Sequence, residues 1–144
     1  MHLAYASDNT IAIQTKGSST SILIDQSGTS NTATVFCGLS GGAYATHTCS
    51  NATMTIDQHG TSNIARAYSQ ITNHNDNVYT INQNGNSNNG YIDLDDDDNV
   101  ASITQNGNSN TGIIYMRGDD NVYTISQTGS SFYAKMYAFG DDST

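Results

Sequence analysis

Aspartates are the residues of this chain whose type and spacing best suit chemistry, and they gather in its second half. A run of four occupies positions 95–98, and pairs follow at 119–120 and 141–142. Calcium binds such carboxylate oxygens, and a calcium site would use these ligands: Asp97, Asp98, Asp119, Asp120, Asp141 and Asp142. The spacing matches neither an EF-hand loop nor the Gly-Gly-x-Gly-x-Asp nonapeptide. We therefore favour the alternative that no cofactor binds and that these solvated charges limit lateral aggregation and premature assembly.

Two cysteines form the second chemical feature. Cys37 and Cys49 bracket an insert rich in Gly and Ser at 38–48, and no second cysteine pair completes a zinc site. A disulfide between them would contribute roughly 3 kcal/mol in the chain-entropy model. Such a bond would indicate an oxidising, extracytoplasmic setting. The alternative is that both are unpaired small residues.

Catalytic constellations are not recognisable in the sequence. The histidines fall in a lead-in, loop or turn, and none shares a short motif with a carboxylate or cysteine: His2, His47, His59 and His74. There is no phosphate loop and no nucleophile elbow. The net charge of −9 argues against nucleic acid as a partner, and no stretch is long enough to span a membrane. We expect no enzymatic activity.

The elements that must position all of these residues are marked by a repeated sequence motif. Gln83-Asn-Gly-Asn-Ser-Asn88 recurs as Gln105-Asn-Gly-Asn-Ser-Asn110, and looser copies begin at Gln26, Gln58 and Gln127. A glycine two residues after the glutamine fits a tight turn, because glycine accepts positive φ. The five glutamines lie 32, 25, 22 and 22 residues apart, and alternating stretches flank each turn. A period of 22 with two strands and two turns predicts the rung of a β-solenoid.

Strand parity predicts which side chains face the core. Counting every second residue places one isoleucine per repeat on the inner face: Ile24, Ile56, Ile81, Ile103 and Ile125. Side-chain amides close the same face at the corners: Gln26, Asn31, Gln58, Asn63, Gln83, Asn88, Gln105, Asn110 and Gln127. Corner amides can bond to the turns and to their equivalents one rung away, which permits their burial. We therefore predict an all-β, two-sheet β-solenoid that stacks end to end into a fibre.

The outer face carries two further columns. One is a broken aromatic column, which could bind glycans or simply stabilise the sheet: Phe36, Tyr68, Asp93, Tyr115 and Tyr137. The other resembles the threonine arrays of ice-binding solenoids, interrupted by Leu23 and Ser102: Thr55, Thr80, Ser102 and Thr124. These columns support the alternative function, a monomeric β-solenoid that binds glycan, calcium or ice.

The expected organisation is simple. Residues 1–8 form a lead-in and residues 9–144 a single solenoid domain, with the insert at 38–48. Ala4-Tyr-Ala6 resembles the end of a secretory signal, so we interpret the chain as a mature or trimmed product. The segment Asn9 to Thr15 is half a repeat, and Gly140 to Thr144 resembles the opening of another. No cap is evident at either end, so the open ends should pair with further subunits.

These repeats resemble the curlin family, the subunits of extracellular amyloid fibres called curli. The family repeat runs Ser, five residues, Gln, a Gly-containing four-residue turn, Asn, five residues, Gln. The resemblance covers about residues 20 to 139, and the first Gln and the Asn keep their spacing in four repeats. The opening Ser is replaced by Thr, Ala or Asn, and other residues replace the closing Gln: Cys37, Ser69, Leu94, Met116 and Ala138. The Cys loop is also foreign to that pattern, so the chain is identified as a divergent member.

The resemblance implies a secreted structural subunit at the cell surface. Its partner would be a further copy of the same chain, stacked head to tail in a homopolymer of the extracellular matrix or biofilm that serves adhesion. A nucleator subunit and secretion machinery are the further partners that it implies. Neither nucleic acid binding nor membrane insertion is expected.

Overall fold

The computed structural model describes residues 8–38, 48–69 and 74–140, and these residues form β-strands joined by turns. Every long strand is six to nine residues, as two strands per repeat require. The strands are β1 (Thr10–Thr15), β2 (Ser21–Thr29), β3 (Thr32–Cys37), β4 (Cys49–Ser50), β5 (Thr53–Thr61), β6 (Ile64–Ser69), β7 (His74–Asn75), β8 (Val78–Asn86), β9 (Asn89–Leu94), β10 (Val100–Asn108), β11 (Thr111–Arg117), β12 (Val122–Ser130) and β13 (Tyr133–Phe139). Within this described part of the chain, no helix is long and apolar enough to cross a membrane.

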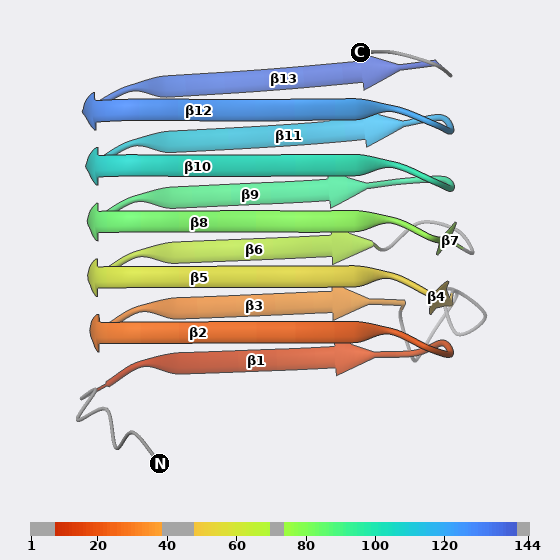
Figure 1. The fold of residues 1–144 in the computed structure, drawn as a ribbon, viewed down its shortest axis with the longest axis horizontal. Helices are drawn as coiled ribbons and strands as arrows, with labels where there is room; N and C mark the ends of the chain where they lie inside the picture. The colour runs from red at the N-terminus through yellow and green to blue at the C-terminus, as the bar shows by residue number, and fades with distance from the viewer. Residues whose placement is uncertain (1–7, 39–47, 70–73, 141–144) are drawn as a thin grey trace.

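The strands form two parallel sheets that face each other. Sheet A has the order β1-β3-β6-β9-β11-β13, and sheet B has the order β12-β10-β8-β5-β2. The chain alternates between the sheets, so each pair of a sheet B strand and the following sheet A strand makes one rung (Figure 1). The two short strands β4 and β7 pair with each other beside the stack. This is the predicted two-sheet β-solenoid.

Strand register keeps equivalent residues of successive rungs in line. Gln26 pairs with Gln58, Gln58 with Gln83, Gln83 with Gln105, and Gln105 with Gln127. The half repeat at the N-terminus forms β1, which pairs with β3. Both long intervals between glutamines are therefore absorbed outside the sheets. They fall where β3 leads to β5 and where β6 leads to β8, and residues 39–47 and 70–73 of these connections lie outside the described residues.

The core lies between the sheets and follows the predicted parity. Ile56, Ile81, Ile103 and Ile125 are buried, while Ile24 in the terminal strand β2 is partly buried. Opposite them, sheet A supplies mostly small residues, including Ala65 and Ala67. A narrow sandwich of this kind buries less apolar area than an ordinary domain, so contacts between rungs must supply much of its stability.

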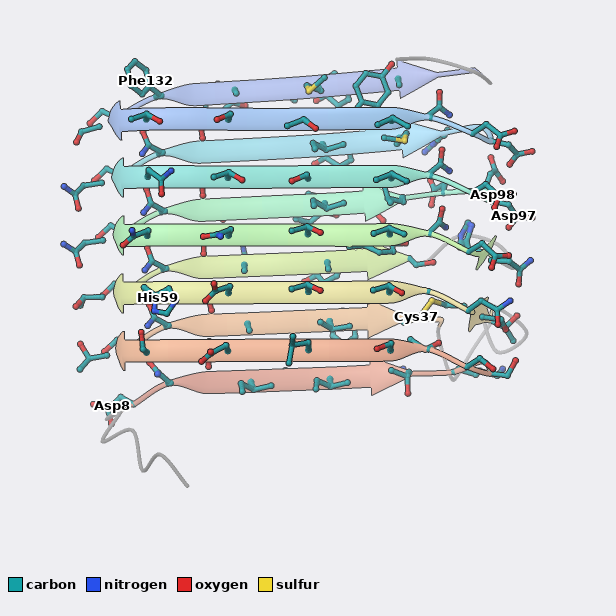
Figure 2. The ribbon with its side chains drawn as sticks, viewed as in Figure 1. Asp8, Cys37, His59, Asp97, Asp98 and Phe132 are labelled. Carbon is teal, nitrogen blue, oxygen red and sulfur yellow. A yellow bond between two sulfur atoms is a disulfide. The ribbon has the colours of Figure 1, made fainter. Side chains whose placement is uncertain are left out.

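Two kinds of turn connect the sheets, and they form opposite edges of the solenoid. The glycine edge contains the turns from each Gln to the following Asn, such as 83–88 and 105–110. The aspartate edge contains the turns from sheet A back to sheet B, such as 95–99 and 117–121. Figure 2 shows Asp97 and Asp98 at one edge, and His59 and Phe132 at the other.

At the glycine edge, strand pairing continues further along the chain than the sequence suggests, and the bend follows it. Gly85 and Gly107 have φ of 129° and 134°, as expected, but pairing continues past them, and β8 ends only at Asn86. A second left-handed residue then completes the bend, and it is the serine before each corner residue, which is Asn in four turns and Phe132 in the last: Ser30, Ser62, Ser87, Ser109 and Ser131. The turn is therefore itself part of the hydrogen-bonded stack.

Glycine is required in this turn because successive turns lie in direct contact. A Cβ added at Gly85 would lie 1.9 Å from the carbonyl oxygen of Gly107, and one at Gly60 would lie 2.0 Å from that of Gly85. No side chain fits such a space. The glycine column thus fixes the separation between rungs at this edge.

Candidate functional site

The buried glutamines form a continuous ladder along the solenoid. The amide Nε2 of Gln58 donates to Oε1 of Gln83 at 2.8 Å, and Nε2 of Gln83 donates to Oε1 of Gln105 at 2.9 Å. Gln26 and Gln105 make the equivalent bonds toward Gln58 and Gln127, at 2.6 and 2.8 Å. All of these bonds point in the same direction, so the ladder has a donor end and an acceptor end.

Each glutamine also ties sheet B to sheet A. Nε2 of Gln83 donates to the backbone oxygen of Ile64 at 2.9 Å, and Gln127 donates in the same way to Thr111 at 3.0 Å. Gln58, Gln83 and Gln105 therefore use both amide hydrogens inside the stack. A buried amide that is satisfied in this way stabilises the fold rather than opposing it.

The corner asparagines make a second ladder with two bonds per rung. Oδ1 of Asn63 accepts the backbone N–H of Asn88 at 3.0 Å, and Nδ2 of Asn63 donates to the backbone oxygen of Gly85 at 2.8 Å. Asn31, Asn88 and Asn110 repeat both bonds toward the next rung. Each asparagine thus anchors the backbone of the following turn.

A third ladder stands at the aspartate edge, and the sequence did not single it out as a site. The backbone N–H of Asn99 donates to Oδ1 of Asn77 at 2.8 Å, and that of Asn121 donates to Oδ1 of Asn99 at 3.0 Å. All three side chains are buried. Their 22-residue spacing, each directly before the valine that begins β8, β10 or β12, was the available signal.

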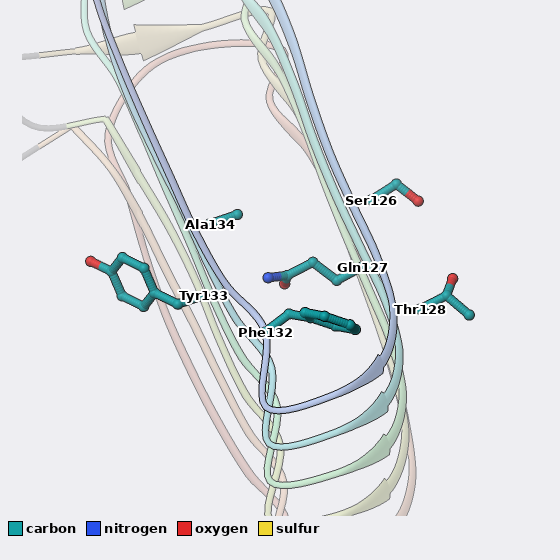
Figure 3. Close-up of a pocket in the computed structure, with 6 residues that line it drawn as sticks. All are labelled: Ser126, Gln127, Thr128, Phe132, Tyr133 and Ala134. Carbon is teal, nitrogen blue, oxygen red and sulfur yellow. The ribbon is translucent and has the colours of Figure 1, made fainter.

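The C-terminal end interrupts the asparagine ladder. Phe132 occupies the corner position and is 51% exposed, and a Cβ added at Gly129 would lie 2.8 Å from its ring. Beside each earlier turn, this place is taken by the glycine carbonyl of the following turn. The Phe132 ring therefore covers the last turn in the position of that carbonyl. Figure 3 shows it beside Gln127 in a hollow between the two sheets.

The N-terminal end leaves part of the glutamine ladder open. Oε1 of Gln26 is inaccessible to solvent and has no hydrogen-bond partner among residues 8–38, 48–69 and 74–140. In every later rung this oxygen accepts the amide of the preceding glutamine. Within the described residues, the glutamine ladder thus ends in an acceptor at Gln26.

The aromatic column on the outer face of sheet A is continuous, whereas the sequence predicted a break at Asp93. Tyr91, two residues earlier on β9, fills the gap, with ring centroids 5.3 Å from Tyr68 and 5.4 Å from Tyr115. Phe36 and Tyr137 extend the column at its two ends, each 5.1 Å from its neighbour. The Tyr91 hydroxyl donates to Oδ2 of Asp93 at 2.9 Å. Burial raises the pKa of Asp93 to about 6, and the Tyr91 hydrogen bond opposes this shift.

The acidic residues of the aspartate edge bind backbone N–H groups between rungs. Oδ1 of Asp97 accepts the N–H of Asn75 at 2.7 Å, and Oδ1 of Asp119 accepts the N–H of Asp97 at 2.8 Å. Desolvation and the neighbouring carboxylates raise the pKa of Asp98. No cluster of metal-ligating side chains occurs within the described residues, and Asp141 and Asp142 lie outside them.

His74 is fully buried, although the sequence places it in a loop. Its Nδ1 lies 3.2 Å from the backbone oxygen of Asp96, and its Nε2 lies 3.8 Å from Oδ1 of Asp95. Arg117 Nε contacts the other oxygen of Asp95 at 3.3 Å. Burial lowers the pKa of His74 and raises that of Asp95, and the attraction between the two groups opposes both shifts. This packed group ties β7 to the turns of the two following rungs.

His59 lies beside a carboxylate two residues away, although the sequence analysis recognised no short motif that joins a histidine to a carboxylate. Its Nε2 lies 2.8 Å from Oδ1 of Asp57, two residues earlier, and its Nδ1 contacts the hydroxyl of Ser27. Its side chain is 47% exposed. As predicted, this histidine belongs to a surface turn, and it links the first two rungs.

The two cysteines form the predicted disulfide. Cys37 ends β3, and Cys49 begins β4, with Cα atoms 5.2 Å apart. The backbone N–H of Cys49 donates to the oxygen of Lys16 at 2.8 Å. The bond thus returns the chain to the aspartate edge after the insert, in the position required to start the next rung.

The comparison with family models agrees with this geometry. Residues 97–129 match the family described as curlin associated repeat, a segment that includes β10, β11 and the glutamine and asparagine ladder positions between them. No curated protein and no solved structure matched the chain. Residues 97–129 thus carry a curlin repeat, and the other rungs repeat its strand and turn geometry, so the chain resembles a divergent member of the curlin family.

Proposed function

We propose that this protein is the structural subunit of a secreted, curli-like functional amyloid fibre in the extracellular matrix, where it serves biofilm cohesion and adhesion. It acts as a structural protein and not as an enzyme. Its partner is a further copy of itself, added head to tail. A nucleator subunit and secretion machinery are further proposed partners, as in the curlin family that the chain resembles.

The observation that carries this proposal is the directed ladder of side-chain amides. Every rung presents a row of hydrogen-bond donors and acceptors to the next rung. Gln83 donates to Gln105, for example, and Asn88 accepts the backbone N–H of Asn110. The same row at a terminal rung has no further rung beside it among the described residues. A second copy that supplies the missing rung gains both backbone and side-chain hydrogen bonds, so the open end favours addition of an identical molecule.

Assembly then proceeds by templated strand addition. Among the described residues, β12 and β13 are the last strands of their sheets at one end, and β2 and β1 are the last strands at the other. The isoleucine column and the glutamine and asparagine ladders fix the register of the incoming copy. A register slip by one residue would point the core side chains outward.

Negative-stain electron microscopy of the purified protein tests the proposal. Long unbranched fibres are expected, with fibre diffraction at about 4.8 Å along the fibre axis from the strand spacing. A protein that stays monomeric over days at high concentration would contradict the proposed function. Fibres lacking the axial reflection would contradict its mechanism.

A further inference from the structure

A serine, a histidine and an aspartate meet on the outer face of sheet B, beside the glycine edge where Figure 2 labels His59. The Ser27 hydroxyl contacts Nδ1 of His59, and Nε2 of His59 lies 2.8 Å from Oδ1 of Asp57. Ser27 belongs to β2 and the other two residues to β5, so strand register brings together residues that are 32 positions apart in the sequence. A hydroxyl, an imidazole and a carboxylate in this order are the groups that activate a serine nucleophile.

We propose that Ser27 is an activated nucleophile, which takes up an acyl group from neutral activated esters and becomes an O-acylserine. The site is a place of covalent modification and not of turnover, so it adds to the structural role of the chain. It needs only the contact between β2 and β5 within one molecule. The inference therefore does not depend on fibre assembly.

The contacts of His59 select the protonation state that a general base requires. A neutral imidazole carries its proton on one nitrogen and accepts at the other. The carboxylate of Asp57 favours the proton on Nε2, the nitrogen beside it, and Oδ1 of that carboxylate is shielded from solvent. Nδ1 is then the accepting nitrogen, and it is the one that contacts the Ser27 hydroxyl.

The transfer of the acyl group balances without any further reactant. Oγ of Ser27 attacks the carbonyl carbon of the ester, and the hydroxyl proton passes to Nδ1 of His59. The bond between this carbon and the leaving oxygen then breaks, and the leaving group departs as a phenolate. The imidazolium of His59 returns its proton to solvent. Because a serine alkoxide leaves much less readily than a phenolate, the acyl group stays on Ser27.

Later rungs show that this arrangement is not needed for stacking. The position of His59 is taken by Asn84 and then Asn106, and the position of Asp57 is taken by Asn82. These rungs pair in the same register as the first two. The histidine and the aspartate are therefore free to serve chemistry, and asparagine is a tolerated replacement for both.

Solvent access and charge determine which acyl donors can react. The side chains of His59 and Asp57 are 47% and 36% exposed, so a small ester can approach the ring. Asp25 pairs with Asp57 in register on the same face, which places a second carboxylate nearby. These charges stabilise the imidazolium that forms on His59 and repel anionic donors. We therefore expect neutral esters with good leaving groups to react.

Acetylation by para-nitrophenyl acetate tests the inference on the purified, folded chain. Mass spectrometry of its peptides should show one acetyl group on Ser27, formed as para-nitrophenolate is released. His59→Asn, which introduces the residue of the following rung, should slow acetylation of Ser27 by about a hundredfold, the lower range for a positioned general base. Asp57→Asn should give an intermediate rate, because the imidazole remains but loses the group that fixes its tautomer. Circular dichroism checks that both variants keep the fold.

A second serine on the same face provides the matched control. Ser126 is exposed and stands in the column of Asp57, where its neighbour in register is Thr104. Ser126→Ala should leave acetylation of Ser27 unchanged, and Ser27→Ala should abolish the fast phase of para-nitrophenolate release. Equal labelling of the two serines, or equal rates in wild type and His59→Asn, would overturn the inference. Release at the wild-type rate from Ser27→Ala would also overturn it, by making His59 the nucleophile.

Discussion

The side-chain amides of Gln83 and Gln105 are joined across 2.9 Å while both residues are fully buried. Removing Gln83 leaves unsatisfied both the amide of Gln58 and the Oε1 atom of Gln105. We expect Gln83→Ala to lower the free energy of unfolding by about 1–3 kcal/mol per group left unpaired and to slow fibre growth. Urea denaturation of the monomer and seeded growth assays measure these effects. Asn84→Ala, at the exposed next position, is the control, and equal behaviour of the two variants would contradict the ladder.

Close contact along the glycine column predicts that a side chain cannot be added there. Comparing Gly85 with Gly140 separates this steric effect from backbone strain. Gly85 and Gly140 have nearly equal φ of 129° and 127°, but a Cβ at Gly140 meets nothing within 4 Å. Gly140→Ala should therefore cost only the backbone strain, about 1–3 kcal/mol. Gly85→Ala adds a clash with the Gly107 carbonyl and should prevent the native stack. Circular dichroism and thermal unfolding compare the two, and equal losses would show that rung contact does not limit this turn.

Phe132 ends the asparagine ladder, so Phe132→Asn should extend it. The new amide would supply an acceptor for the next backbone N–H and a donor for the next glycine carbonyl, each bond contributing about 1 kcal/mol. We expect faster elongation, followed by thioflavin fluorescence and checked by microscopy. Tyr133→Thr removes a neighbouring exposed aromatic ring and serves as the control. Slower growth of Phe132→Asn than of this control would show that the phenyl ring itself drives docking.

The raised pKa of the Asp93 carboxyl predicts how the free energy of unfolding depends on pH. Its folded-state pKa of about 6 lies above the ordinary value of 3.8, so between these values the folded protein binds more protons than the unfolded chain. The stabilisation is complete below the lower value and is lost as the pH rises through 6. Tyr91, Asp95 and Arg117 are the charged or titratable groups that act on this carboxyl.

Asp93→Asn removes this titration and keeps an acceptor for the Tyr91 hydroxyl. The variant should show a flatter decline in unfolding free energy between pH 4 and pH 7, by on the order of 1 kcal/mol, than the wild-type protein. Asp25→Asn, an exposed aspartate on β2, controls for the change in net charge. An unchanged difference between wild type and Asp93→Asn across this pH range would contradict the raised pKa.

The disulfide should stabilise the monomer through the short loop that it closes. Cys37 and Cys49 are separated by 12 residues, and a loop of this size corresponds to roughly 3 kcal/mol. Cys37→Ala/Cys49→Ala should unfold at correspondingly lower urea concentration. Dithiothreitol should shift the wild-type protein in the same direction and leave the double variant unchanged. A shift in the double variant would indicate an effect unrelated to the disulfide.

Sequence periodicity was sufficient to predict the rungs and the inner face. The spacing from Gln105 to Gln127 equals one full turn of the solenoid, and alternation placed Ile103 inside because strand side chains alternate. The disulfide followed from the position of two cysteines around an insert. These features are local in the repeat, so they need no knowledge of the neighbouring rungs.

Features that depend on two rungs at once were not predictable in the same way. Tyr91 fills the gap beside Asp93 because its side chain leans along the outer face, which register alone does not give. His74 is held by Asp95 and Asp96 of the next turn, and Arg117 of the following rung contacts Asp95 in turn. The left-handed serines, such as Ser109, were missed because the glycine two residues earlier already accounted for a turn.

The two edges of the solenoid also differ in what they allow a protein engineer to do. At the glycine edge every turn has the same length, because the glycine carbonyl of one turn lies against the glycine of the neighbouring turn. At the aspartate edge the chain accommodates the insert between Cys37 and Cys49 while Gln26 and Gln58 keep their pairing. In the proposed fibre, a foreign peptide grafted between those two cysteines would therefore recur at the same edge of every subunit, in a regular array along the fibre.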